Sequence, residues 1–177
     1  YFKNSNYISQ DSFDAKNYGY DYSNIDINSS IYKIPLEKNY FDIILCLNVL
    51  EHVYEPKLAF KEMERVLKKG GKIVLFSPFM DGEHLQPVDY YRYTQFFYQE
   101  IAKEFNLSIK HISPHGGYFY LISDLLKKKL FKNKFTKVIY YLILPIFITL
   151  NPIFYLIDYV SGDIGINIGY EVIFEKN

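Results

Sequence analysis

The chain has 177 residues, of which 49% are hydrophobic and 23% are charged, and its formal net charge is +0. This size and composition fit one globular domain with its own core, and a zero net charge gives no general attraction to nucleic acid. Cys46 is the only cysteine, which excludes an internal disulfide and a cysteine-rich metal site and favours a reducing compartment.

The first part of the chain contains three strand-like segments. Asn6–Gln10 is predicted to be a short strand that ends at Asp11, and the polar residues 12–24 are predicted to form a loop. Asn24–Ile27 is a second short strand candidate. Phe41–Leu47 is a continuous apolar run, which is typical of a strand that is buried on both faces.

A helix and a further strand follow. Pro56 suits the first turn of a helix, and Gly70 is placed to end it. The apolar positions with helical spacing are Ala59, Phe60, Met63, Val66 and Leu67. Lys72–Ser77 is then predicted to be a second buried strand.

The remaining elements complete an alternating pattern. Thr94 can cap a helix that runs to about Phe105, Leu107–Ile112 reads as a strand, and Ile164–Phe174 is strand-like. Alternation of this kind predicts an α/β fold with a doubly wound, mostly parallel sheet.

Residues 125–157 differ from the rest, because they contain no acidic residue. Six lysines crowd the start of this segment: Lys127, Lys128, Lys129, Lys132, Lys134 and Lys137. Val138–Ile157 carries no charge and is about long enough to cross a bilayer once, but Pro145 and Asn151–Pro152 would break a straight helix.

We interpret residues 118–160 as a hydrophobic helical insertion. If the strands on either side of it share one sheet, both ends of the insertion must lie on one side of any membrane. We therefore expect residues 125–157 to dock peripherally on a membrane in a bent or hairpin form, with the lysines facing anionic headgroups. The alternative is that these helices pack on the sheet or form a dimer contact.

The segment from Pro35 to Pro78 carries the most specific pattern. FDIILCLNVLEHV is followed by a helix and then by LKKGGKIVLFSPF. This arrangement resembles the methyltransferase type 11 group of the class I S-adenosylmethionine-dependent methyltransferases, in which "FD-apolar-EH" and "LK-x-GG" bracket strands four and five. The resemblance extends from about Tyr7 to Gly117, and the competing interpretation is another Rossmann-like domain.

The resemblance implies a Rossmann-like sheet whose last strand, near Tyr170–Phe174, runs antiparallel beside Leu107–Ile112. It also implies that Asp11, Asn48 and Ser77 lie at the carboxyl ends of their strands, along one sheet edge. The family's first strand and glycine loop are not found in this sequence. We therefore expect residues 1–177 to be one incomplete methyltransferase domain, inactive alone and a weak binder of S-adenosylmethionine at most.

The cofactor residues follow from the same resemblance. Asp11 matches the acid that holds the ribose hydroxyls, although a solvated loop residue is the alternative. Ser30 stands where the family has an adenine-contacting acid, which is a departure from the pattern. Ile31 is expected to stack on adenine and to offer its backbone N–H, and Asn48 is placed at the cofactor.

Asn48, Glu51 and His52 have the spacing i, i+3, i+4, which could bring them onto one helical face. Some quinone O-methyltransferases are similar and hold a divalent metal with two acids and a histidine. Here the first acid is the neutral amide of Asn48, which makes a poor site, so we expect no metal. The alternative is a structural Glu51–His52 pair.

The loop after Ser77 is expected to carry the acceptor side, because ligands bind beyond the carboxyl ends of parallel strands. Its HLQPVDYYRYT run resembles a subset of type 11 enzymes that is associated with surface-polysaccharide synthesis. We expect His84 to act as a general base and Arg92 to grip an anionic acceptor, while Tyr90 and Tyr91 wall the pocket. The alternative is that Arg92 merely pairs with Asp89.

The sequence therefore favours methyl transfer from S-adenosylmethionine to a small or a lipid- or polysaccharide-linked acceptor, in the cytoplasm at the inner face of the membrane. The second hypothesis is a non-catalytic membrane-surface binding module that keeps the fold, and a glycine loop upstream of Tyr1 would count against it. A third, a nucleotide-sugar or NAD enzyme, is disfavoured by the Glu51–His52 and Gly70–Gly71 pattern. Nucleic acid is not an expected partner, and His111 and His115 are expected to be structural.

Overall fold

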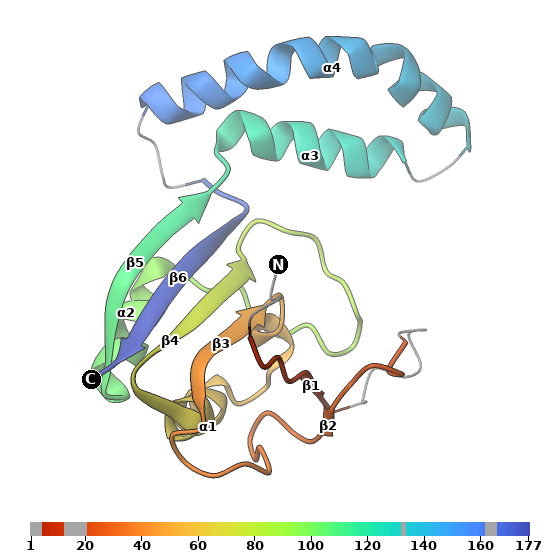
Figure 1. The fold of residues 1–177 in the computed structure, drawn as a ribbon. Helices are drawn as coiled ribbons and strands as arrows, with labels where there is room; N and C mark the ends of the chain where they lie inside the picture. The colour runs from red at the N-terminus through yellow and green to blue at the C-terminus, as the bar shows by residue number, and fades with distance from the viewer. Residues whose placement is uncertain (1–4, 13–20, 132–133, 162–165) are drawn as a thin grey trace.

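The computed structural model describes residues 5–12, 21–131, 134–161 and 166–177. A four-stranded sheet is packed against two helices, and a long helical hairpin stands at one end of it (Figure 1). The elements in chain order are β1 (Gln10–Asp11), β2 (Ile27–Asn28), β3 (Phe41–Leu47), the 3-10 turn η2 (Leu50–His52), α1 (Pro56–Val66), β4 (Leu67–Pro78), α2 (Gln95–Glu104), β5 (Leu107–His115), α3 (Tyr118–Leu130), α4 (Lys134–Ser161) and β6 (Gly169–Lys176).

The main sheet has the strand order β3-β4-β6-β5. Strands β3 and β4 are parallel, whereas β6 runs antiparallel to both β4 and β5. Three strands therefore point the same way and only β6 is reversed. This confirms the predicted α/β class, with a mostly parallel sheet and an antiparallel last strand beside β5.

The predicted end of α1 is wrong. The helix stops at Val66 and Leu67 already begins β4, so Gly70 does not end a helix. Phe41 pairs with Leu67 but Ile43 pairs with Lys72, which leaves a bulge in β4 between these two points. Gly70 has a φ of +74° in this bulge, a conformation that glycine adopts without strain.

The predicted position of Asp11 along the main sheet edge is also wrong. Within the described residues, β1 pairs only with β2, in parallel, as a two-stranded sheet of its own. The other two residues of that prediction do lie together, because the Asn48 N–H donates to the carbonyl oxygen of Phe76, next to Ser77, at 2.9 Å.

The core lies between the main sheet and helices α1 and α2. Phe60 of α1 is fully buried, and its ring is 5.7 Å from that of Phe174 on β6. It also contacts Phe97 of α2 and Phe105, with centroids 6.4 Å away in each case. Helix α2 begins after Thr94, but the Thr94 side chain makes no capping hydrogen bond.

Helices α3 and α4 lie side by side as a hairpin above the end of the sheet where β4 and β5 end and β6 begins (Figure 1). Pro145 and Pro152 both lie within α4, and its segments Thr136–Ile146 and Ile148–Val160 meet at an angle of 61°. Among the described residues, no single helix has the length and apolarity needed to cross a membrane, whereas this bent pair meets both criteria together.

Candidate functional site

The loop between β4 and α2, residues 79–94, folds over the 3-10 turn that follows β3. The N–H groups of Tyr90 and Tyr91 donate to the carbonyl oxygen of Glu51, at 2.9 and 3.3 Å. The Tyr93 hydroxyl donates to the carbonyl oxygen of Leu50 at 3.1 Å. A fourth contact joins Nδ1 of His52 to the carbonyl oxygen of Val88. Together these contacts hold loop 79–94 against the 3-10 turn at residues 50–52.

Glu51 and His52 of the 3-10 turn meet His84 of this loop, and we call these three residues the Glu51 cluster. Glu51 is fully buried, and its Oε1 lies 3.8 Å from Nε2 of His52 and 3.9 Å from Nε2 of His84. The two imidazole rings are perpendicular, with centroids 4.8 Å apart. Burial raises the pKa of the Glu51 carboxyl, and the nearby His52, His84 and Arg92 oppose that rise.

His84 is positioned by the loop itself. Its backbone N–H donates to Oδ2 of Asp89 at 2.9 Å, and its Nδ1 is 3.0 Å from the carbonyl oxygen of Gly82. These contacts direct Nε2, the remaining ring nitrogen, toward Glu51. The structure therefore places the predicted base His84 next to a buried carboxylate, a partnership that the sequence analysis missed.

Arg92 is engaged by the same loop. Its guanidinium makes a bidentate pair with Asp89, at 2.6 and 2.9 Å, and also donates to the carbonyl oxygens of Asp81, Gly82 and Tyr91. The pairing that the sequence left as an alternative is thus present. Contact between Arg92 and an acceptor stays a prediction.

Replacing Asp89 with Asn should lower the free energy of unfolding by about 1.5–3 kcal/mol, the usual value of hydrogen bonds to charged groups. Asp89 is 4% exposed, and hydrogen bonds from Arg92 hold its pKa well below the ordinary range. Such a group stabilises the fold above its unfolded pKa of about 3.9, and the effect is lost as the pH falls through the lower folded value.

Urea unfolding of wild type and Asp89→Asn, at neutral and at acidic pH, measures this difference. The difference in the free energy of unfolding should be largest near neutral pH and should decrease as the pH falls. Asp42→Asn is the matched control, because Asp42 is 81% exposed and its pair with Lys68 should contribute less than about 1 kcal/mol. Equal losses for the two variants would contradict the structural role of Asp89.

The residues predicted to bind the cofactor lie at strand ends. Asp11 is half-buried at the end of β1, and its carbonyl oxygen accepts the N–H of Ser29. The Ser30 hydroxyl accepts the N–H of Tyr32 at 3.2 Å, Ile31 packs partly against the core, and Asn48 is exposed with a φ of +53°. Their contact with a cofactor stays a prediction.

Tyr90 and Tyr91 were predicted to wall the acceptor pocket, and Tyr54 joins them in the structure. The Tyr54 and Tyr90 rings meet edge to face at 5.4 Å, and the Tyr91 hydroxyl donates to the carbonyl oxygen of Tyr54. No sequence motif pointed to Tyr54. Its position two residues after His52 was the one available signal.

Sequence comparison finds similar proteins for parts of the chain. A family model described as a methyltransferase domain matches residues 7–75. An uncharacterized protein of Methanocaldococcus jannaschii is 45% identical over 49 residues, which are 28% of this chain and 21% of that protein. An uncharacterized methyltransferase of Schizosaccharomyces pombe is 46% identical over 44 residues, or 25% of this chain and 16% of its own length.

Solved structures show the same fold at low sequence identity. A Galdieria sulphuraria protein provisionally named sarcosine dimethylglycine methyltransferase has a TM-score of 0.51 at 20% identity, with 92% of this chain and 62% of that chain covered. The 4+2 cyclase SpnF has a TM-score of 0.53 at 15% identity, with 92% and 60% covered. This chain thus spans about a fifth of the first curated relative and less than two thirds of these solved chains. Residues 7–75 are therefore similar to a methyltransferase domain, and the fold of the chain is that of these solved structures.

Proposed function

We propose that the protein transfers a methyl group from S-adenosylmethionine to a hydroxyl of a small or a lipid- or polysaccharide-linked acceptor. The observation that carries this proposal is the Glu51 cluster, which lies under loop 79–94 beyond the carboxyl ends of β3 and β4. In sheets of this type, ligands bind beyond those strand ends. The similarity to methyltransferase domains implies S-adenosylmethionine as the methyl donor. The loop provides titratable side chains that could act on the acceptor.

The chemistry asks little of the protein beyond alignment. The sulfonium of S-adenosylmethionine already activates the methyl group, so the bond from carbon to the acceptor oxygen forms as the carbon–sulfur bond breaks and S-adenosylhomocysteine leaves. The acceptor proton passes to Nε2 of His84, and the Glu51 carboxylate stabilises the resulting imidazolium. Arg92 and Asp89 hold the loop that positions His84.

The cofactor side is assigned to β1, β2 and β3. Asp11 would accept hydrogen bonds from the ribose hydroxyls, Ile31 would contact the adenine, and Asn48 would contact the cofactor from the end of β3. Ser30 replaces the acid expected at the adenine amino group, and its hydroxyl already bonds within its own turn. Recognition of the adenine therefore depends on Ile31 more than on Ser30.

Asp11→Ala and His84→Ala should have separable effects in the intact protein. Loss of the Asp11 hydrogen bonds should weaken binding of S-adenosylmethionine about tenfold or more. Loss of His84 should leave that affinity nearly unchanged but lower turnover by about a hundredfold or more. Calorimetry measures the affinity, and incorporation of radiolabelled methyl into lipid and polysaccharide fractions measures the turnover.

His111→Ala is the matched control, because His111 is exposed on β5 and outside the Glu51 cluster. It should change neither quantity. Suppose instead that Asp11→Ala lowered turnover without weakening the binding of S-adenosylmethionine, and that His84→Ala weakened that binding without lowering turnover. The two assigned roles would then be exchanged. If the intact protein bound no S-adenosylmethionine, methyl transfer would be refuted and a non-catalytic module would remain.

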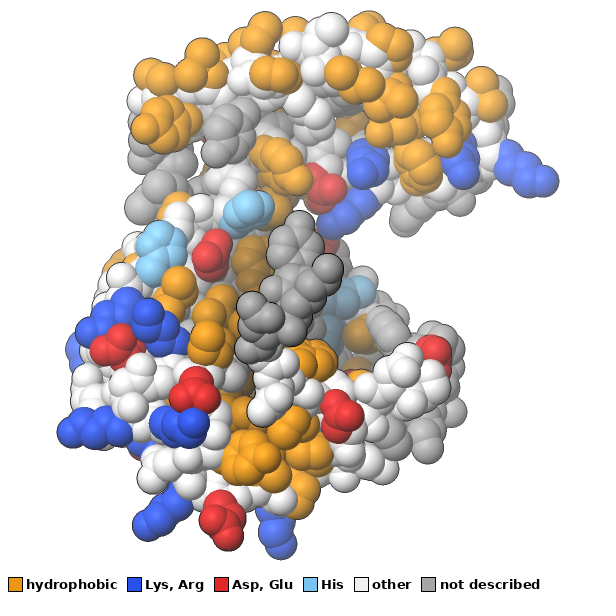
Figure 2. Space-filling view, in the orientation of Figure 1, with side chains coloured by type: hydrophobic (Ala, Val, Ile, Leu, Met, Phe, Trp, Pro, Cys, Tyr) orange, Lys and Arg blue, Asp and Glu red, His pale blue; other side chains and the backbone are white. Residues whose placement is uncertain are grey.

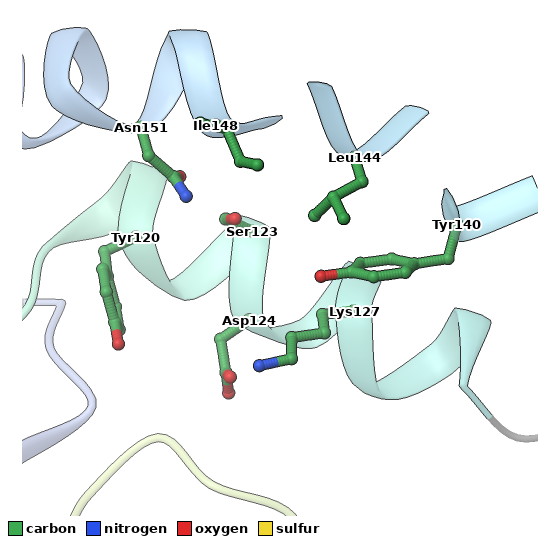
Figure 3. Close-up of a pocket in the computed structure, with 8 residues that line it drawn as sticks. All are labelled: Tyr120, Ser123, Asp124, Lys127, Tyr140, Leu144, Ile148 and Asn151. Atoms are coloured by element: carbon green, nitrogen blue, oxygen red, sulfur yellow. The ribbon is translucent and has the colours of Figure 1, made fainter. Parts of the chain in front are cut away.

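We also infer that the α3–α4 hairpin docks on an anionic membrane at the inner face. Its outer side carries apolar side chains over most of α4 (Figure 2), and Leu142 and Val160 are each 74% exposed. A cavity between the helices is lined by polar side chains, Ser123 and Asn151 among them, as well as by Leu144 and Ile148 (Figure 3).

The exposed apolar side of α4 suits lipid better than water, because a hairpin in water normally turns its apolar side inward. Basic side chains gather at the far end of the hairpin (Figure 2), where Lys129, Lys134 and Lys137 are exposed, while Lys132 lies outside the described residues. Lys128 instead pairs with Asp81 of loop 79–94, at 2.6 Å. Docking would thus hold the acceptor loop near a lipid-linked acceptor.

A further inference from the structure

Three potential acceptor atoms of the Glu51 cluster lie close to one another: Oε1 of Glu51 and Nε2 of His52 and His84. The His52 Nδ1 lies 2.6 Å from the carbonyl oxygen of Val88, and the His84 Nδ1 lies 3.0 Å from that of Gly82. A carbonyl oxygen can only accept, so each Nδ1 carries a proton. The other ring nitrogen, Nε2, which faces Glu51, is then the one available to bind a ligand.

Glu51 is the third acceptor. Its side chain is fully buried, and neither of its oxygens has a hydrogen-bond partner. Both Nε2 atoms lie 3.8–3.9 Å from Oε1, which is too long for a hydrogen bond, and the three ligand atoms lie within 4.8 Å of one another. A buried carboxylate without a hydrogen-bond partner is costly, and a cation between these atoms would stabilise it.

We propose that Glu51, His52 and His84 form a binding site for a divalent transition-metal ion such as Zn²⁺. Two imidazole nitrogens and one carboxylate suit Zn²⁺, or Fe²⁺ with open coordination positions. They suit Mg²⁺ and Ca²⁺ less well, because those ions prefer oxygen ligands. The hydrogen bonds from each Nδ1 to a backbone carbonyl are the contacts that usually orient histidine ligands.

The dimensions fit with a small adjustment. Tetrahedral zinc with bonds of about 2.0–2.1 Å holds its ligand atoms about 3.3 Å apart. The ring of His84, whose side chain is 36% exposed, can rotate to shorten the longer separations. This set differs from the Asn48, Glu51 and His52 set that sequence spacing suggested, because Asn48 is exposed and His84 takes the third place.

Three protein ligands leave at least one coordination position open, as in catalytic zinc sites. With the ion bound, His84 would be a ligand, and an acceptor hydroxyl at the open position would be deprotonated through the ion's charge rather than by a free imidazole. This last role rests on the proposed function. The binding of metal does not, since it needs only residues of the Glu51 cluster.

The test is zinc binding by the full chain without S-adenosylmethionine, after removal of bound metal with a chelator. Calorimetry and metal analysis should give about one zinc ion per chain. His84→Gln and Glu51→Gln should each weaken binding at least about tenfold. His111→Gln, a histidine exposed on β5, should bind zinc as wild type does.

Circular dichroism of each variant shows whether it remains folded. If Glu51→Gln unfolds, the partly exposed His84 still provides the test. The proposal is overturned if the wild-type protein binds no more zinc than His84→Gln does, or if all variants bind equally. If the intact protein bound zinc but not S-adenosylmethionine, the metal site would stand and methyl transfer would be refuted.

Discussion

Phe60→Ala is expected to lower the free energy of unfolding by about 3–5 kcal/mol, the usual cost of emptying a buried phenylalanine site. Phe60 has no exposed surface, and its ring contacts Phe97, Phe105 and Phe174. These contacts join α1 to α2 and β6, so the cavity would lie where three elements meet. Denaturation in urea, followed by circular dichroism, measures the change.

Phe96→Ala is the matched control. Phe96 lies on α2 next to Phe97, but it is 64% exposed, so its removal should change stability by no more than about 0.5 kcal/mol. A loss for Phe60→Ala as small as that for Phe96→Ala would show that α1 does not pack on the sheet as described.

The second large effect is expected in vesicle flotation. Wild-type protein should float with vesicles that contain anionic lipid and far less with neutral ones, because each exposed lysine near the surface contributes about 1 kcal/mol. Deletion of residues 125–157 should abolish flotation. Leu142→Glu combined with Ile153→Glu should reduce it at least about tenfold, since burial of each apolar side chain is worth about 1.5–3 kcal/mol.

Phe96→Glu, a change of the same kind on α2 and away from the hairpin, should float as wild type does. Three results would contradict membrane docking: flotation that ignores the lipid charge, flotation that survives the deletion, or equal losses for the hairpin and α2 variants. Hairpin variants that stay in solution but change the oligomeric state would favour the dimer contact instead.

Short-range patterns of the sequence determined most of the scaffold. Phe41–Leu47 was predicted with the bounds that β3 has, because the run is almost continuously apolar. Its predicted burial on both faces is wrong, since Ile43, Leu45 and Leu47 are 57%, 43% and 50% exposed. The pairing of β6 with β5 followed from the family resemblance. The bend in α4 followed from Pro145 and Pro152, which cannot continue the backbone hydrogen bonds of a helix.

Other local features depended on contacts that spacing does not encode. Leu67 continues the helical spacing of α1, yet it begins β4, because it pairs with Phe41 across the sheet. Asp11 was predicted on the main sheet edge, but hydrogen bonding places it in a separate pair of strands. In both cases tertiary pairing decided where the local pattern allowed two outcomes.

The candidate site shows the same division. The sequence by itself determined that Glu51 and His52 follow one apolar strand and that His84 lies in the loop after the next strand. Only the tertiary structure decided that they meet, because the N–H groups of Tyr90 and Tyr91 bind the Glu51 carbonyl and hold the loop over η2. Spacing along one helix could relate Glu51 to Asn48 and His52, whereas a contact across 33 residues depends on the path of a loop, which has no period for a sequence to reveal.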